Sequence, residues 1–223
     1  MARHRAMTLI SEQSNWLVAI DTSSDRAGVA LFDGSAASVI AWPAHRNHTV
    51  TTLEQLDHLL RLAGITLRDI GAIAVAVGPG SFSALRVGLS TAKGLAFSLD
   101  LPLIGISTTD AIAAQLAWTA RPVIAVMIAG RGRVVWRRYD GGVAPDAPRN
   151  TTVDELRGQL DGAVVAGEID LLTGIEAIEL PVGGRVEQIA RLGWQRYRAG
   201  EQDDAALLEP VYAHGRRQDA ISV

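Results

Sequence analysis

The residues from Gly78 to Ala96 constrain the fold more than any other part of the chain. They follow the apolar run Ile73 to Val77, so the sequence predicts a buried strand, a glycine-rich turn and then a helix. Between Phe82 and Leu99 the only charged residues are Arg86 and Lys93, which predicts a helix that is buried on more than one side. A strand that turns directly into a helix of this kind indicates the α/β class.

Small residues recur at every fourth position of this helix and therefore share one face: Ala84, Gly88, Ala92 and Ala96. Glycine inside a helix costs about 1 kcal/mol relative to alanine, so we expect a close contact to compensate for Gly88 and for Gly94. Two interpretations remain open. The stripe packs on the protein's own sheet, or it lets the backbone of another helix come close. We predict that one side of the helix contacts its sheet and the small-residue side contacts a second helix, which can belong to another chain.

Composition limits the class of protein. With 223 residues and 48% hydrophobic content, the chain can bury a core in one large domain or two lobes. The absence of cysteine excludes disulfides, thiolate metal sites and a cysteine nucleophile, and it fits the cytoplasm. The net charge of −3 argues against a broad electrostatic surface for nucleic acid. No apolar run is long enough for a signal peptide or a membrane span, so we expect a cytoplasmic protein without a membrane partner.

The first half of the chain predicts the element order βββαβα. The expected strands are Trp16–Ile20, Ala27–Phe32, Ala37–Trp42, Ala72–Val77 and Leu103–Ile106, the last of them leading into the next unit. The first helix is expected from the capping-box spacing of Thr51 and Glu54 and ends at Gly64. Its apolar stripe consists of Val50, Leu53, Leu56, Leu60 and Ala63. The second helix is the one between Phe82 and Leu99.

The second half repeats this order in a weaker form. We expect helices at Ser107–Trp118, Thr152–Leu160 and Gly184–Arg198, strands at Pro122–Ala129, Val134–Tyr139 and Ala163–Ala166, and a loop at Asp140–Asn150. Two copies of one unit predict two lobes with a cleft between them. The predicted organisation is a disordered arm at residues 1–15, a first lobe at 16–106, a reduced second lobe at 107–214 and a flexible tail at 215–223.

Two turns are the candidates for nucleotide chemistry. One contains Asp21, Thr22 and Ser23, and the other contains Gly78, Gly80 and Ser81. We expect both turns to open toward the cleft, where they could hold phosphates, with Asp21 positioning magnesium for weakly bound ATP or ADP. The alternative is that Asp21 and Thr22 only satisfy turn backbone.

Other kinds of site receive less support from the sequence. The glycine turn lacks the third glycine of a dinucleotide-binding fingerprint. His45 and His48 have no clear third ligand, so we interpret them as surface or capping residues and predict no metal site. The arginine-rich hairpin around Arg131 and Arg137 could touch phosphate, but we interpret it as a solvated hairpin.

Several motifs, taken in order, resemble the TsaB (YeaZ) family: Val18-Ala-Ile-Asp-Thr-Ser23, Gly78-Pro-Gly-Ser-Phe82, Leu85-Arg-Val-Gly-Leu89, Ala92-Lys-Gly-Leu-Ala96, Pro102-Leu-Ile-Gly-Ile-Ser107 and Pro210-Val-Tyr212. The resemblance implies an actin-like (ASKHA, ribonuclease H-like) fold with two lobes. It also implies a role in making threonylcarbamoyladenosine at position 37 of tRNA. In that pathway TsaB is the non-catalytic partner of the transferase TsaD, and the ATPase TsaE joins them. The resemblance therefore implies that this chain contacts tRNA only indirectly, through the complex.

The resemblance further implies that the chain pairs with a TsaD-like subunit, or with itself, through helices of the first lobe. The interface residues expected from this are Val50, Leu53, Leu56, Leu60, Ala84, Arg86, Gly88, Leu89, Ala92, Lys93 and Ala96. The catalytic relative carries a His-x-x-x-His pair where this chain reads Ser107-Thr-Thr-Asp-Ala-Ile112, so no catalytic residues are predicted.

The chain also departs from the family pattern. The second-lobe motif Asp-Ala-Arg-x-x-Glu-Val-Tyr is replaced by Ile128-Ala-Gly-Arg-Gly-Arg-Val-Val135. A divergent paralogue with another partner is therefore one alternative. A nucleotide-binding phosphotransferase or ATPase that uses Asp21 is a second, and a metallopeptidase is a third.

Overall fold

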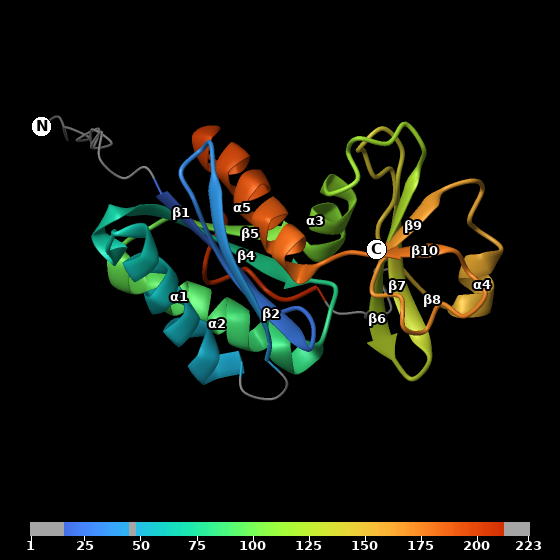
Figure 1. Ribbon diagram of the computed structural model, residues 1–223, viewed down its shortest axis with the longest axis horizontal. Coiled ribbons are helices and arrows are strands. Elements are labelled where there is room, and N and C mark those ends of the chain that lie inside the picture. The colour runs from blue at the N-terminus through green and yellow to red at the C-terminus, as the bar shows by residue number, and fades with distance from the viewer. Residues whose placement is uncertain (1–15, 45–47, 212–223) are drawn as a thin grey trace, which may run out of the picture.

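The computed structural model describes residues 16–44 and 48–211, and for residues 48–50 it describes the backbone alone. Two α/β lobes lie side by side along the long axis of the molecule (Figure 1). The first lobe contains a five-stranded sheet in the order β3-β2-β1-β4-β5. Its elements are β1 (Trp16–Asp21), β2 (Arg26–Phe32), β3 (Ala37–Pro43), α1 (His48–Ala63), β4 (Ile70–Gly78), α2 (Phe82–Leu99) and β5 (Leu103–Ser107).

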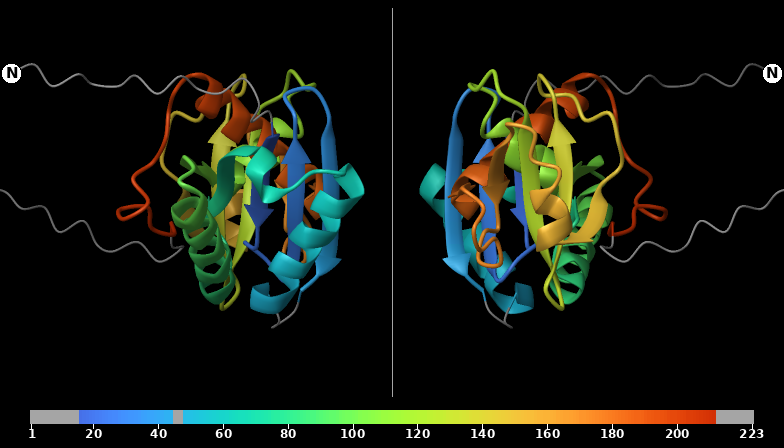
Figure 2. Two further views of the ribbon diagram at one scale, coloured as in Figure 1. Left: turned by 90° about the vertical axis from the view of Figure 1, so that its left-hand side faces the viewer. Right: turned by 90° about the vertical axis from the view of Figure 1, so that its right-hand side faces the viewer.

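Apolar strands in the centre of this sheet place a core on both of its faces. β1 runs antiparallel to β2 and parallel to β4, and all nine residues of β4 are buried. α1 and α2 lie next to each other and cover one face, where Leu56, Leu89 and Ala92 pack on Val18 and Val75. α5 (Val182–Arg198) covers the other face. Figure 2 shows α1 and α2 together on the side of the sheet away from α5.

The second lobe is built on a smaller five-stranded sheet in the order β10-β9-β6-β7-β8. Its elements are β6 (Val123–Gly130), β7 (Arg133–Tyr139), β8 (Arg149–Thr152), α4 (Val153–Arg157), β9 (Val164–Gly167) and β10 (Ala177–Glu179). α4 and the segment after β9 pack on one face through Leu156 and Leu172. α3 (Thr108–Ala114) packs on the other face through Ile112 and Ala113.

The element order predicted for the first lobe is confirmed, with ends that differ by a few residues. The predicted capping box at Thr51 is wrong, because α1 begins at His48 and Thr51 lies inside the helix. A capping box occurs instead at the unpredicted 3₁₀ turn Leu67–Asp69, where Thr66 and Asp69 bond to each other's backbone. α3 ends at Ala114, well before the predicted end at Trp118. The short strands β8 and β10 were not predicted.

The C-terminal part of the chain returns to the first lobe. α5 was predicted to belong to the second lobe, but its Val186 and Ile189 pack in a core with Leu17 and Ala30 of the first sheet. Beyond α5, the backbone N–H of Val211 donates to the carbonyl of Val77 at 2.7 Å. The boundary at residue 107 is therefore wrong for the residues from 182 onward. The predicted arm at 1–15 and tail at 215–223 lie outside the described residues.

None of the helices in the described ranges has the length and apolar character that crossing a membrane requires.

Candidate functional site

The interlobe cleft contains a buried ion pair. Asp21 ends β1, and Arg185 lies in the first turn of α5. The Nε atom of Arg185 donates to Oδ2 of Asp21 at 2.5 Å, and the side chains are 5% and 0% exposed. The other guanidinium nitrogens of Arg185 reach Oγ of Ser24 at 3.0 Å and Sδ of Met127, in the second lobe, at 3.9 Å. The arginine therefore joins the two lobes at the carboxyl end of β1.

The two predicted phosphate turns bind each other. Oδ1 of Asp21 accepts hydrogen bonds from the backbone N–H of Ser23 at 2.9 Å and from its hydroxyl at 2.7 Å. The carbonyl of Ser23 accepts from the N–H of Ser81 at 2.7 Å. A Cβ atom on Gly80 would collide with the same carbonyl, so glycine is required for this approach. The two turns thus lie against each other, with polar groups of one facing the other.

These contacts do not fit a site for magnesium and phosphate. Both oxygens of Asp21 are already bound, and the hydroxyl of Thr22 donates to the carbonyl of Ala84 at 2.6 Å. Gly78 faces the carbonyl of Val211, so this end of the turn is also covered by the chain itself. The expectation that both turns open toward the cleft is therefore wrong for Thr22 and Gly80, which pack against the protein, whereas Ser23 and Ser81 line the cleft. The alternative, that Asp21 and Thr22 satisfy local backbone, agrees with the hydrogen bonds.

The remaining cleft is small and carries several carboxylates. It encloses about 290 Å³, and its lining includes Asp25, Glu168, Asp170 and Glu179. Burial raises the pKa of Glu168, while a hydrogen bond of 2.7 Å from the N–H of Ile128 and the charge of Arg185 oppose that rise.

The described residues contain no group of three or more acidic or histidine side chains arranged to hold a metal ion. Of the histidines considered from the sequence, His45 lies outside the described residues, and the side chain of His48 is not described.

Replacing Glu168 with glutamine is expected to stabilise the protein in a pH-dependent way. The raised pKa means that the folded protein holds this proton more tightly than the unfolded chain does. The free energy of unfolding therefore falls as the pH rises from the ordinary glutamate pKa through the raised one. Above that pH range Glu168 is ionised in the folded protein, and its buried charge lowers the stability by the full amount. Glutamine keeps an oxygen for Ile128 without the charge. Urea unfolding should show a larger gain at about pH 8 than at about pH 4. Equal gains at the two pH values would contradict the assignment.

The small-residue stripe of α2 faces the protein itself. Ala84, Ala92 and Ala96 are at most 4% exposed, and they pack within their own lobe. A Cβ on Gly88 would collide with the hydroxyl of Thr22, at the end of β1. The stripe is therefore covered by its own lobe, where α2 lies next to α1, and it leaves no surface for a helix of another chain. Of the other predicted interface residues, Leu56, Leu60 and Leu89 also lie in the core.

The outward face of α2 carries two exposed aromatic rings with small or polar residues between them. Phe97 is 90% exposed and Phe82 is 56% exposed, and the guanidinium of Arg86 lies 5.5 Å from the centre of the Phe82 ring. The exposed positions between the two aromatic rings are small or polar: Ser83, Ser90 and Gly94, together with Arg86. We call this surface, from Phe82 to Phe97, the outer stripe of α2. The spacing of its residues by three or four positions was the signal in the sequence that could have revealed it.

A groove runs beside the outer stripe, between α1 and α2. It encloses about 570 Å³ and is lined mainly by leucine and isoleucine side chains: Leu53, Leu56, Leu60, Ile65, Leu67 and Leu95. Asp57, Arg61 and Arg68 are the charged residues of its lining. Among the predicted interface residues, Leu53 and Arg86 are exposed and Lys93 is half-buried, so their role remains a prediction. The side chain of Val50 is not among those described.

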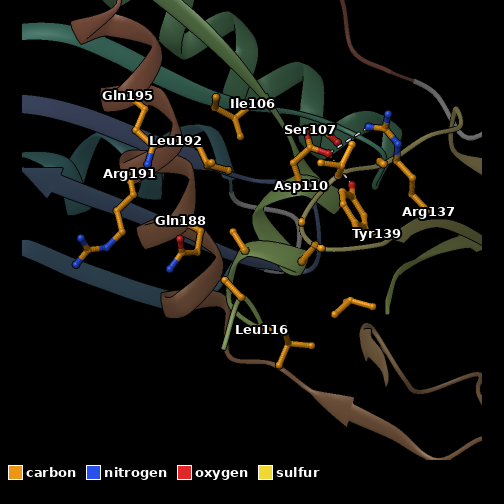
Figure 3. A pocket seen from close by; sticks show the side chains of 18 of the residues that line it. Ile106, Ser107, Asp110, Leu116, Arg137, Tyr139, Gln188, Arg191, Leu192 and Gln195 are labelled. Carbon is orange, nitrogen blue, oxygen red and sulfur yellow. Dashed lines mark hydrogen bonds and ion pairs between the residues drawn. The ribbon is translucent and has the colours of Figure 1, made fainter. Parts of the chain in front are cut away.

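A second, larger groove was not predicted from the sequence. It encloses about 990 Å³ between α3, α5 and the residues that follow β7. Figure 3 shows Gln188 and Leu192 of α5 on one wall and Asp110 and Tyr139 near the other. The Tyr139 hydroxyl donates to Oδ1 of Asp110 at 2.5 Å, and burial together with this bond raises the pKa of Tyr139. The phenol therefore stays protonated, and its hydroxyl is held by Asp110.

Comparisons with known proteins agree with the fold. The family model described as TsaD, tRNA N6-adenosine threonylcarbamoyltransferase, matches residues 39–161. The TsaB protein of Escherichia coli is 37% identical over 126 residues, which cover 55% of this chain and 54% of that protein. A tRNA N6-adenosine threonylcarbamoyltransferase of Geobacter sulfurreducens is 31% identical over 89% of this chain and 59% of its own length. The match thus spans between half and three fifths of these curated relatives.

A solved structure extends the likeness over almost the whole fold. YeaZ from Pseudomonas aeruginosa superimposes with a TM-score of 0.75 and 26% identity, covering 89% of this chain and 99% of its own.

Two lobes with five-stranded sheets, joined at the carboxyl end of β1, define this protein as a member of the actin-like (ASKHA) class of α/β proteins. Within that class, the chain belongs to the family of TsaD-type domains and, more narrowly, to the TsaB (YeaZ) family.

Proposed function

We propose that this chain is a non-catalytic subunit of the cytoplasmic machinery that makes threonylcarbamoyladenosine at position 37 of tRNA. In this role it pairs with a TsaD-like transferase, or with a second copy of itself, and a TsaE-like ATPase joins the complex. The observation that carries the proposal is the outer stripe of α2 with the apolar groove beside it. The family membership supplies the pathway.

The outer stripe has the chemistry of a protein interface. Aromatic and arginine side chains dominate the binding energy of protein interfaces, and exposed aromatic rings on a monomer are candidates for such contacts. Phe82, Arg86 and Phe97 provide these groups, while Ser90 and Gly94 between them leave room for the backbone of another helix. The stripe thus takes the place of the buried small-residue face as the candidate interface, on the same helix.

The rival function, a phosphotransferase or ATPase, depends on the turn after β1. There Arg185 and Ser23 take both oxygens of Asp21, and the two turns bind each other. This geometry favours a supporting subunit over an enzyme. The net charge of −3 favours tRNA contact through the complex rather than through this chain alone.

The departure from the family motif at residues 128–135 concerns the second lobe, far along the chain from the outer stripe. There Arg133, the first residue of β7, donates to the side chain of Asn150 of β8 at 2.7 Å. A divergent paralogue would therefore keep the same docking helix and differ in its partner, which the pairing experiment below also distinguishes.

Replacing Phe97 with aspartate is expected to weaken pairing with a co-expressed TsaD-like subunit by at least about tenfold. In the complex, an aromatic side chain that the partner covers would be replaced by a charge that loses its water. The matched control is Trp118→Asp, because Trp118 is 77% exposed and follows α3, which packs against α5 and not against α2. Calorimetric titration measures the affinity, and thermal unfolding shows that both variants remain folded. Unchanged affinity in Phe97→Asp, or an equal loss in Trp118→Asp, would exclude the outer stripe as the interface.

A further inference from the structure

We propose that Arg185 is a built-in cation that fills the place of a divalent metal ion at the end of β1 and so closes the interlobe cleft to metal-bound phosphates. The expected occupant of this place in an actin-like protein is a cation with a nucleotide, and the residues here do not fit one. The inference does not rest on the proposed pairing with a transferase, because it concerns the cleft and not the outer stripe.

The cleft needs a positive charge. Asp21 is fully buried and Glu168 is largely buried, and Asp25 lines the same cleft. The charges of Asp21 and Asp25 both act on Glu168 unfavourably, and that of Arg185 acts on it favourably. Carboxylates gathered in a poorly solvated place are stable only with a cation or a proton among them. The Arg185 guanidinium is the positive charge that lies within hydrogen-bond distance of Asp21.

The position of Arg185 is fixed by the packing of its helix. Val186, the next residue of α5, is fully buried against Gly28 of β2, where a Cβ would approach its Cγ1 to 2.9 Å. Arg185 itself is 4% exposed, and its three guanidinium nitrogens contact Asp21, Ser24 and Met127. Because these contacts come from both lobes, the side chain cannot leave the cleft unless α5 or the second lobe moves. The cation is therefore part of the fold rather than an exchangeable ion.

A guanidinium in this place excludes a magnesium ion sterically and electrostatically. Magnesium requires six oxygen ligands in near-octahedral geometry, several of them water molecules. Here the Nε atom lies 2.5 Å from the carboxylate oxygen that such an ion would use. Removing the positive charge leaves Asp21 buried and unpaired, and a divalent cation becomes the most favourable replacement for it.

The test compares Arg185→Gln with Arg185→Lys, which keeps the charge. Urea unfolding is measured with magnesium or manganese chloride and with sodium chloride at equal ionic strength. We expect the unfolding equilibrium constant of Arg185→Gln to fall about tenfold at a metal concentration of about ten times its dissociation constant. The wild type and Arg185→Lys should not respond. The double variant Asp21→Asn with Arg185→Gln should lose the response, since the metal ligand is then removed.

Two results would overturn the proposal: a wild-type protein that is stabilised by the metal as strongly as Arg185→Gln, or an Arg185→Gln variant that folds and does not respond. If Arg185→Gln does not fold, the wild type decides the question by itself. Manganese is titrated into the isotopically labelled wild type, and the NMR signals of the Ser23, Ser24 and Ile128 amides are followed. Signals that keep their intensity support the closed cleft, whereas selective broadening contradicts it. Magnesium with ADP serves as a second probe in the same titration.

Discussion

Replacing Gly88 with alanine will lower the free energy of unfolding by about 1–3 kcal/mol, whereas the same replacement at Gly94 will raise it by about 0.5–1 kcal/mol. Both glycines lie inside α2, so the gain in helix propensity is the same for both. A methyl group at Gly88 collides with the hydroxyl of Thr22, which is fully buried and donates to the carbonyl of Ala84. A methyl group at Gly94 meets no atom within 4 Å.

Chemical unfolding of the two single variants and the wild type measures this difference directly. Because the substitution, the helix and the propensity term are shared, the difference between the two variants reports the packing of Gly88 alone. If alanine stabilised the protein at both positions, α2 would not lie against the end of β1, and the small-residue stripe would be free to contact a partner. Because an added methyl group at Gly94 leaves the fold intact, any effect of this variant on pairing would report on the outer stripe.

The periodicity of α2 predicted a close contact for both of its glycines, which was correct for Gly88 and wrong for Gly94, where an added Cβ meets no atom within 4 Å. It did not predict which surface provides the contact, because a repeat of four positions defines a face of a helix but not the neighbour of that face. The exposed rings of Phe82 and Phe97 were the missing information, since they show that the opposite face is the one left uncovered.

The elements of the first lobe could be predicted because its strands are mainly apolar and its two long helices have a clear stripe. β8 and β10 could not be predicted, because Arg149–Thr152 is polar and Ala177–Glu179 has three residues. These strands form by pairing with β7 and β9, the strands that directly precede them, and not through an apolar pattern of their own. The return of α5 to the first lobe depends instead on long-range packing against β1 and β2.

Of the ion pair in the cleft, the sequence predicted one member and not the other. Asp21 was recognised because an acidic residue directly follows an apolar strand, but its partner Arg185 lies 164 residues away. A signal for Arg185 was present in the sequence. The buried positions of α5 are Val182, Arg185, Val186, Ile189, Ala190 and Gly193, so an arginine occupies a core position of an amphipathic helix. A charged residue at such a position requires a buried partner of opposite charge.

Replacing Asp21 with asparagine will lower the free energy of unfolding by about 3–5 kcal/mol, because it leaves the Arg185 guanidinium buried without a counter-charge. Asparagine is close to aspartate in size, so the loss reflects charge and not a cavity. The matched control is Asp57→Asn, which breaks the ion pair of Asp57 with Arg61 on α1. That pair has the similar distance of 3.0 Å, but its side chains are 68% and 69% exposed, so the expected loss stays below about 1 kcal/mol.

The double variant Asp21→Asn with Arg185→Met separates the charge from the packing. Methionine keeps the apolar stem of Arg185 beside Met127 and removes the charge, so much of the stability lost in Asp21→Asn should return, as replacement of both members of a buried pair by neutral residues allows. Urea unfolding of both single variants and of the double variant gives the coupling energy between the two residues. A double variant as unstable as the sum of the single ones would show that the two residues act independently, and the ion pair would then not be what joins the lobes.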